Sequence, residues 1–199
     1  MGKTNGFLIF RHNLTQELHS GFIAYVGKKS ASVEMYFLLH HVKNWNWFND
    51  ERLNGVLNHQ SRKHMDSDLQ RYLYCSIYAQ RFNEAPKLEN FPEALLPNHK
   101  NAKQGIFSDR FRVQLKNQPA TTITSHISKD GHYYIHPDPL QARSLTPREA
   151  ARLQGFPDRV EKHFIKNKIS QTSSYQIIGN SVPVPLAYAV ISNFLKYFI

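Results

Sequence analysis

The sequence holds a single cysteine, Cys75, among its 199 residues, so it can form no intrachain disulfide. This is typical of proteins that work in a reducing compartment. No stretch approaches the roughly 20 apolar residues of a transmembrane helix, and the N-terminus shows no signal-peptide cleavage pattern. Neither a glycine-rich nucleotide loop nor an internal repeat appears. We therefore expect a cytoplasmic protein without a membrane segment.

Negative charge is also scarce. The sequence has 25 lysine and arginine residues but only 15 acidic residues, which gives a net charge of +10. The surplus is largest over 141–199, which has 8 basic and 3 acidic residues. A surplus of this size favours a polyanionic partner, either nucleic acid or an acidic membrane. A solvated basic surface is the alternative.

The first two thirds of the chain mix helix and strand signals. The pattern predicts a helix over 66–82, begun by Asp66 or Ser67, with one apolar side formed by Leu69, Leu73, Ile77 and Phe82. A short helix is expected at 92–96, and 20–39 reads as a strand, a turn and a second apolar run of either type. Three β-rich pieces follow at 111–115, 121–127 and 132–137, with Asp130-Gly131 as a hairpin signal.

The last third has one sharply marked helix. In TPREAARLQGF, Thr146 is the expected N-cap, Pro147 occupies the first helical position, and Glu149 completes a capping box. Gly155 is expected to end this helix in a left-handed conformation. Residues 159–175 read as a polar loop. A final helix is predicted over 183–198, docked through an apolar face formed by Leu186, Val190, Ile191, Phe194, Leu195 and Phe198.

Two segments carry a family resemblance. RSLTPREAARLQGFPD (143–158) resembles the ninth motif of the cytosine-5 DNA methyltransferases, and YQIIGNSVPVPLA (175–187) resembles the tenth. Residues 107–137 resemble the end of that family's target-recognition domain. The resemblance is weaker over 59–106 and faint before residue 50.

The resemblance implies a mixed α/β fold. A target-recognition region of short strands and loops would span 1–138. The segment 139–199 would supply C-terminal helices that complete a Rossmann-like domain dependent on S-adenosylmethionine.

The resemblance also implies roles for individual residues. Thr122-Ile123, or less readily Thr124 with its neighbour, would lie against the target base. Arg148 and Glu149 would bind across to the recognition region as structural residues, and Gly179 would allow a tight turn. The candidate cofactor contacts are Asn180, Ser181 and Val182, although a plain helix cap would explain the first two. The candidate contacts to double-stranded DNA are Arg110, Arg112 and Lys129, with Lys116, His126 and His132 beside them.

The chemistry of this family needs three motifs that are missing from the sequence. They are a Phe-x-Gly-x-Gly cofactor turn, a Pro-Cys nucleophile and a Glu-Asn-Val carboxyl group. Cys75 has no preceding proline and reads as a packed helix residue. The pairs His59/His64 and His132/His136 have metal-like spacings, but without a cysteine or carboxylate cluster we expect no metal site. We therefore expect no catalytic residue in this chain.

Three explanations of that absence stay open. The chain is one subunit of a split methyltransferase, a C-terminal fragment of a longer enzyme, or a DNA-binding module without a methylation partner. Its starting Met1 and the two complete motifs favour the first two. The expected function is sequence-specific DNA recognition within a cytosine-5 methyltransferase of a bacterial restriction-modification system. The expected partner is a catalytic subunit that carries the Pro-Cys and Glu-Asn-Val motifs.

Overall fold

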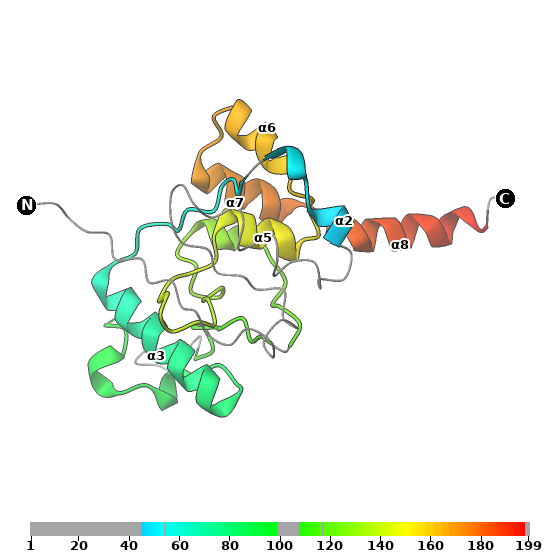
Figure 1. Cartoon of the computed structure of the whole chain (residues 1–199). Helices are drawn as coiled ribbons and strands as arrows, with labels where there is room; N and C mark the ends of the chain where they lie inside the picture. Colours follow the sequence, from blue (N-terminus) through cyan, green and yellow to red (C-terminus); the bar gives the residue numbers. More distant parts are fainter. Residues whose placement is uncertain (1–44, 54, 99–107, 117, 198–199) are drawn as a thin grey trace, which may run out of the picture.

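The computed structural model describes residues 45–53, 55–98, 108–116 and 118–197 (Figure 1). The strand and second run predicted within 20–39 lie outside the described residues. The longer helices are α3 (Asp66–Phe82), α5 (Pro147–Leu153), α6 (Val160–Lys166), α7 (Gln171–Asn180) and α8 (Val184–Leu195). Short helical turns are α2 (Trp45–Phe48), η2 (Glu51–Leu53), η3 (Leu88–Asn90), η4 (Glu93–Leu95) and η5 (Ser125–Ser128).

Helix α3 has the predicted length, but it buries a different face from the predicted one. Leu73, Ile77 and Phe82 are 42 to 52% exposed. The buried side instead carries Asp68, Tyr72, Cys75, Ser76 and Ala79. Of these, Tyr72, Cys75 and Ala79 pack with Phe91, Phe111, Val113 and Ile135 in one core cluster. The polar members of this face find partners far along the chain, since the Ser76 hydroxyl donates to the His136 carbonyl at 2.8 Å. No side-chain cap begins the helix, and Met65 is the capping residue.

A second core cluster lies under α5, α6 and α7. It joins Ile123, Ile127 and Tyr134 to Leu145, Ala150, Ala151, Phe164, Tyr175 and Ile178. The predicted capping box of α5 is confirmed, because Thr146 accepts from the Glu149 N–H at 3.2 Å and donates its own N–H to Glu149 at 2.8 Å. Gly155 follows with φ of +79°, as predicted.

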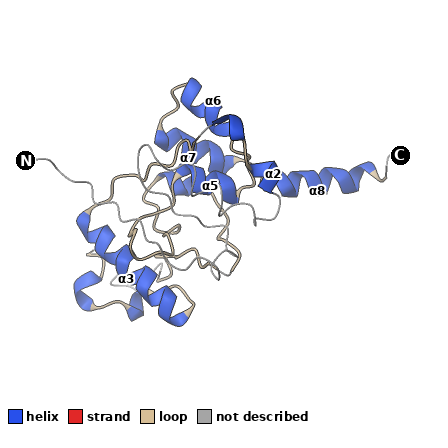
Figure 2. Cartoon of the chain, in the orientation of Figure 1, coloured by secondary structure: helices blue, strands red, loops and turns tan. Residues whose placement is uncertain are grey.

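The predicted strands are not confirmed in the part of the chain that the structure describes, where Figure 2 shows helices and loops. The pieces 111–115 and 132–137 form a single parallel bridge, between Val113 and Ile135, rather than a strand ladder, and Ile135 also bridges Ser144. The piece 121–127 holds the turn η5 and has no strand partner, so the predicted hairpin across Asp130-Gly131 is wrong. Side chains from neighbouring segments satisfy its backbone instead, as described below.

Residues 159–175, predicted as a polar loop, contain α6 and the start of α7. Phe164 turns one face of α6 into the core. The Ser170 hydroxyl accepts from the Ser173 N–H at 3.1 Å and begins α7. Local caps and one buried aromatic ring therefore order a stretch whose composition is polar.

Helix α8 forms nearly where predicted, but it is not docked. It leaves the body of the molecule as a separate rod (Figure 1), and none of its residues is buried. Its large apolar side chains are 45 to 75% exposed, namely Leu186, Tyr188, Val190, Ile191, Phe194 and Leu195.

By length and composition alone, the stretch Gln171–Leu195 meets the requirements of a membrane-spanning helix, a feature that the sequence patterns did not predict. The structure interrupts this stretch between α7 and α8, and α7 buries Tyr175 and Ile178 in the core. One such stretch is weak evidence for a membrane span.

Candidate functional site

The predicted contact with the target base falls in the loop 121–129, which two buried side chains support. Gln114 accepts the Thr121 N–H at 2.8 Å through Oε1 and donates through Nε2 to the Tyr133 carbonyl at 2.8 Å. The Tyr134 hydroxyl accepts the Thr124 N–H at 3.2 Å and donates to the Thr122 carbonyl at 3.1 Å. These side chains take the place of a strand partner for the backbone of the loop.

The predicted Thr122-Ile123 pair is divided between surface and core. Thr122 is exposed, whereas Ile123 is only 4% exposed and packs in the cluster beneath α5 and α7. Thr124, the alternative residue, is also exposed, and its hydroxyl lies 3.0 Å from that of Tyr134. Thr122 is therefore free to meet a ligand, while Ile123 holds the loop to the core.

Gln154, directly after α5, joins this loop to the predicted cofactor segment. Its Nε2 donates to the carbonyls of Ile123 at 3.1 Å, Ile178 at 3.2 Å and Ser181 at 3.4 Å. The backbone carbonyl of Gln154 accepts the Val184 N–H at 3.0 Å. One buried side chain thus contacts the 121–129 loop, the end of α7 and the link to α8.

Gly179 brings the same segments into direct contact. A Cβ added there would lie 2.2 to 2.4 Å from backbone atoms of Thr124 and Ser125, so any larger residue would collide with the loop. The residue lies inside α7. The expectation of a tight turn at Gly179 is therefore wrong, and its missing side chain instead permits close approach of two backbones.

Asn180, Ser181 and Val182 form the surface where α7 ends. Asn180 is exposed, and its side chain makes no hydrogen bond to the described residues. Ser181 is the C-cap of α7 and donates its hydroxyl to the Ile178 carbonyl. Val182 is 61% exposed. An exposed amide beside an exposed apolar side chain fits one rim of a pocket for S-adenosylmethionine, although it does not form a complete pocket.

The predicted DNA-binding arginines already have acidic neighbours. Arg110 pairs with Asp130, and Arg112 pairs with Asp109. The Arg112 guanidinium also lies over the Tyr133 ring, 4.9 Å from its centroid. Lys129 is exposed and pairs with no carboxylate among the described residues. These ion pairs leave both guanidinium groups partly exposed but lower the net positive charge around them.

Arg148 and Glu149 each bind a buried partner of opposite charge. Arg148 pairs with Asp158, which also receives two bonds from Arg152 at 2.7 and 2.8 Å. Glu149 receives two bonds from Arg143 at 2.7 and 2.8 Å. Toward the preceding region, the Arg148 N–H donates to the Asn58 carbonyl at 3.3 Å.

Burial acts on these carboxyl groups with opposite outcomes. For Glu149, burial works to raise the pKa, but the charge and hydrogen bonds of Arg143 hold it below the ordinary value. For Glu161 in α6, burial raises the pKa to about 6, although a hydrogen bond from Asn58 at 2.9 Å opposes the rise. Glu149 is thus a satisfied buried charge and Glu161 a costly one.

Arg62 contributes to the site, although no sequence pattern predicts this role. Its guanidinium donates to the Lys129 carbonyl at 2.9 Å and to the Ile127 carbonyl, and it lies 4.2 Å from the centroid of the Tyr175 ring. It thereby holds the end of the 121–129 loop against α7. Gln114, Tyr134 and Gln154 were missed for the same reason, because a polar residue type reveals nothing about which distant carbonyl it will meet.

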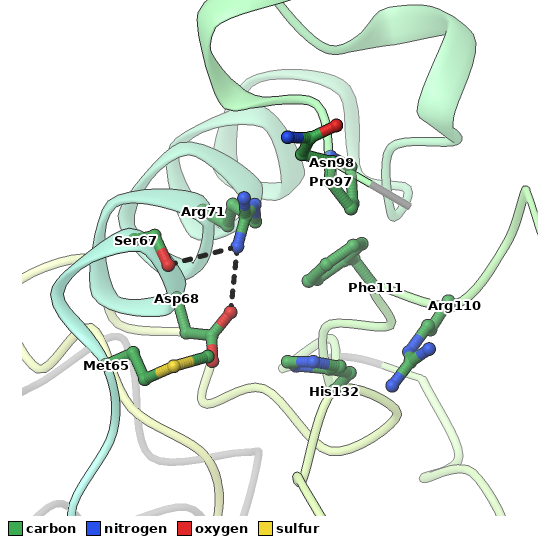
Figure 3. Close-up of a pocket in the computed structure, with 9 residues that line it drawn as sticks. All are labelled: Met65, Ser67, Asp68, Arg71, Pro97, Asn98, Arg110, Phe111 and His132. Atoms are coloured by element: carbon green, nitrogen blue, oxygen red, sulfur yellow. Dashed lines mark hydrogen bonds and ion pairs between the residues drawn. The ribbon is translucent and has the colours of Figure 1, made fainter. Parts of the chain in front are cut away.

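A cavity of about 270 Å³ lies beside the first turns of α3. Figure 3 shows that Arg71 bonds to Asp68 and Ser67, while Arg110, Phe111 and His132 form the opposite wall. Arg71 pairs with Asp68 in the lining, and Arg110 pairs with Asp130 outside it, so each guanidinium already has an acidic partner. This cavity lies apart from the α7 end and has no feature of a catalytic centre.

Cys75, His64 and His132 act as packed residues. Cys75 is fully buried, and burial raises the pKa of its thiol far above the ordinary value. The Tyr72 hydroxyl lies 2.8 Å from Nδ1 of His132, and His64 Nε2 accepts the Ser144 N–H at 3.3 Å. Among the described residues, no group of three potential ligands is placed to hold a metal ion.

Comparison with known proteins identifies one family model and several DNA methyltransferases as similar to this chain. A family model described as C-5 cytosine-specific DNA methylase matches residues 23–196. The chain is 42% identical over 142 residues to type II methyltransferase M.Bpa9945I of Bacillus paralicheniformis, which covers 71% of this chain and 30% of that protein. It is 29% identical over 142 residues to type II methyltransferase M.FnuDI of Fusobacterium nucleatum, covering 60% of this chain and 40% of that protein.

The chain spans well under half the length of these curated relatives. No solved structure matches it. The family model nevertheless covers most of the sequence, including both motif segments, the 121–129 loop and α8. The chain therefore belongs to the C-5 cytosine-specific DNA methylase family.

Proposed function

We propose that this chain is the DNA-recognition part of a cytosine-5 methyltransferase of a bacterial restriction-modification system. The polypeptide that carries the nucleophilic cysteine, the carboxyl group and the cofactor turn lies outside this sequence. The relatives are type II methyltransferases, and the matched region makes up only 30 to 40% of the first two. Action on DNA points to a cytoplasmic setting.

The observation that carries the proposal is the junction at the end of α7. There the exposed Thr122 lies on a loop that contacts Gly179 directly, one residue before Asn180. We infer that Thr122 and the cationic side chains of Arg110, Arg112 and Lys129 face DNA. Asn180, Ser181 and Val182 contribute one edge of the cofactor pocket. S-adenosylmethionine would supply the methyl group, and this chain would orient the base and bound one side of the site.

The exposed face of α8 supports a catalytic partner over a free-standing DNA-binding module. Six large apolar side chains that stay exposed on a projecting helix are costly to leave in water. We propose that the catalytic half covers them. Whether that half belongs to the same polypeptide or to a separate subunit does not alter the role of this chain.

Methylation of host DNA tests this proposal. The chain is co-expressed with the product of the reading frame immediately upstream, which is expected to contain the Pro-Cys and Glu-Asn-Val motifs. Bisulfite sequencing of host DNA then maps 5-methylcytosine. We expect methylation at one sequence, its loss when the partner cysteine is replaced, and its retention in Cys75→Ala. If the intact pair leaves DNA unmethylated, the proposal is wrong, and the result favours a non-catalytic DNA-binding protein instead.

The salt dependence of DNA binding tests the proposed interface separately. The logarithm of the affinity of the chain for duplex DNA should fall linearly with the logarithm of salt concentration. Lys129→Met should reduce that slope by about one if Lys129 contacts a phosphate. Lys196→Met, at the end of the projecting α8, is the matched control. An affinity that does not respond to salt would contradict DNA binding.

A further inference from the structure

We propose that Gln154 is the positioning residue that fixes Thr122-Ile123 relative to Asn180–Val182. This inference rests on the function proposed above, since it concerns the same two contact surfaces. Gln154 itself is 3% exposed and therefore touches neither DNA nor cofactor. It acts through the segments that it joins.

The geometry of the amide supports this role. Its two N–H groups are shared among carbonyls of Ile123, Ile178 and Ser181, which come from three separate segments. Ile178 and Ser181 stand at the C-terminal end of α7, where carbonyls are not all satisfied by i to i+4 helical bonds, and Gln154 adds to the bonds that Ser181 already makes to the Ile178 carbonyl. An uncharged double donor at this point satisfies the helix end and the DNA-facing loop together.

No residue of similar size can replace the amide. Methionine has the same length but no donor, so the Ile123 and Ser181 carbonyls would lose the Gln154 amide, whereas the Ile178 carbonyl would keep its bonds from Ser181. An ionised glutamate would place a negative charge against three carbonyl oxygens. The direct contact of Gly179 with Thr124 and Ser125 leaves no room for the loop to move closer and compensate. Loss of the amide should therefore loosen both segments together.

Hydrogen exchange of the whole chain measures this coupling. In Gln154→Met, amide exchange over 121–129 and over 178–184 should rise together, by roughly 10- to 100-fold for two or three lost hydrogen bonds. Exchange within α3 should stay unchanged. Gln176→Met, an exposed glutamine on α7, is the matched control. Unchanged exchange, or a rise confined to one of the two segments, would overturn the proposal.

A glutamate variant separates hydrogen bonding from packing. In Gln154→Glu, burial among carbonyl oxygens favours the protonated acid, which donates one hydrogen bond. As the pH falls, protection of both segments should return toward the wild-type level, measured against Gln154→Met at each pH. If the glutamate variant is no better protected than the methionine variant at any pH, the amide is not the linking group.

The reconstituted enzyme then tests whether the link matters for chemistry. With the catalytic half present, Gln154→Met should lower kcat on the order of 10- to 100-fold, as misplaced reacting groups do. KM for DNA and for S-adenosylmethionine should change less than kcat. Normal kcat despite loosened segments would refute the positioning role alone. An inactive wild-type pair would refute the proposed function and this inference with it.

Discussion

The buried glutamates of α5 and α6, Glu149 and Glu161, should change the stability of the chain in opposite directions when each is replaced by glutamine. Glu149 lies at the third position of α5 and receives two hydrogen bonds from Arg143, with both side chains largely buried. Glu161 lies in α6 with one oxygen bonded to Asn58 and the other without a partner among the described residues. Replacing each by glutamine keeps the size and removes the charge.

The expected magnitudes follow from the partners. Glu149→Gln leaves the buried Arg143 charge uncompensated, which typically costs about 3–5 kcal/mol. Glutamine still completes a capping box, so the start of α5 is preserved. Glu161→Gln removes a carboxylate whose pKa burial raises to about 6. A shift of about 1.5 from the ordinary value corresponds to about 2 kcal/mol, so this variant should be stabilised at pH 7.

Urea unfolding at pH 7, followed by circular dichroism, measures both effects. Because total stabilities are about 5–15 kcal/mol, the loss at Glu149 should bring the midpoint down sharply, whereas Glu161→Gln should raise it. The raised pKa of Glu161 means that ionisation opposes folding, so the advantage of its glutamine variant should shrink as the pH falls from about 6 to 4.5 and should be absent below that range. A loss under about 1 kcal/mol at Glu149, or the same sign for both variants, would refute this electrostatic argument.

Three further predictions concern the junction, pH and α8. Gly179→Ala should destabilise the chain by about 1–3 kcal/mol in thermal unfolding, because its Cβ meets backbone atoms of the 121–129 loop, whereas Ile177→Ala on the exposed side of α7 should cost far less. Burial, aided by the charge of Arg143 and opposed by Glu149, lowers the pKa of His136 to about 4. The unfolded chain therefore binds a proton that the folded chain does not, and stability should fall by up to about 3 kcal/mol from pH 6.5 to 4. If His136→Asn lost as much stability as the wild-type chain between pH 6.5 and 4, His136 would not be the group responsible. Phe194→Asp, on the exposed face of α8, should change the free energy of unfolding of the chain by less than about 0.5 kcal/mol but abolish co-purification with the catalytic half.

Features decided by local sequence were predictable. The capping box of Thr146 and Glu149, the left-handed Gly155 and the span of α3 depend on residues within one or two turns of each other. The start and end of α5 could therefore be predicted from residues close to one another in the sequence. The family assignment itself was also predictable, since both motifs are contiguous in the sequence.

Features decided by distant polar partners were not predictable. The buried face of α3 was misjudged because Tyr72 and Ser76 bond to carbonyls near residue 130, which makes polar positions favourable inside. The piece 121–127 has the composition of a strand, yet Gln114, Tyr134 and Gln154 satisfy its backbone from elsewhere. Residue types could not reveal these pairings. The predicted division at residue 138 and the roles of the individual contact residues stay predictions.

Helix α8 starts next to the predicted cofactor segment Asn180–Val182, so its exposed apolar face and that segment are neighbours. The helix begins at Val184, two residues after Val182, and Val184 is itself bonded to Gln154. A polypeptide that buries the apolar face of α8 must therefore lie next to Asn180–Val182. If α8 docks onto the proposed catalytic half, that docking should also complete the proposed cofactor pocket. Cofactor affinity should accordingly be weak in this chain alone and appear on pairing, and Phe194→Asp should remove both together.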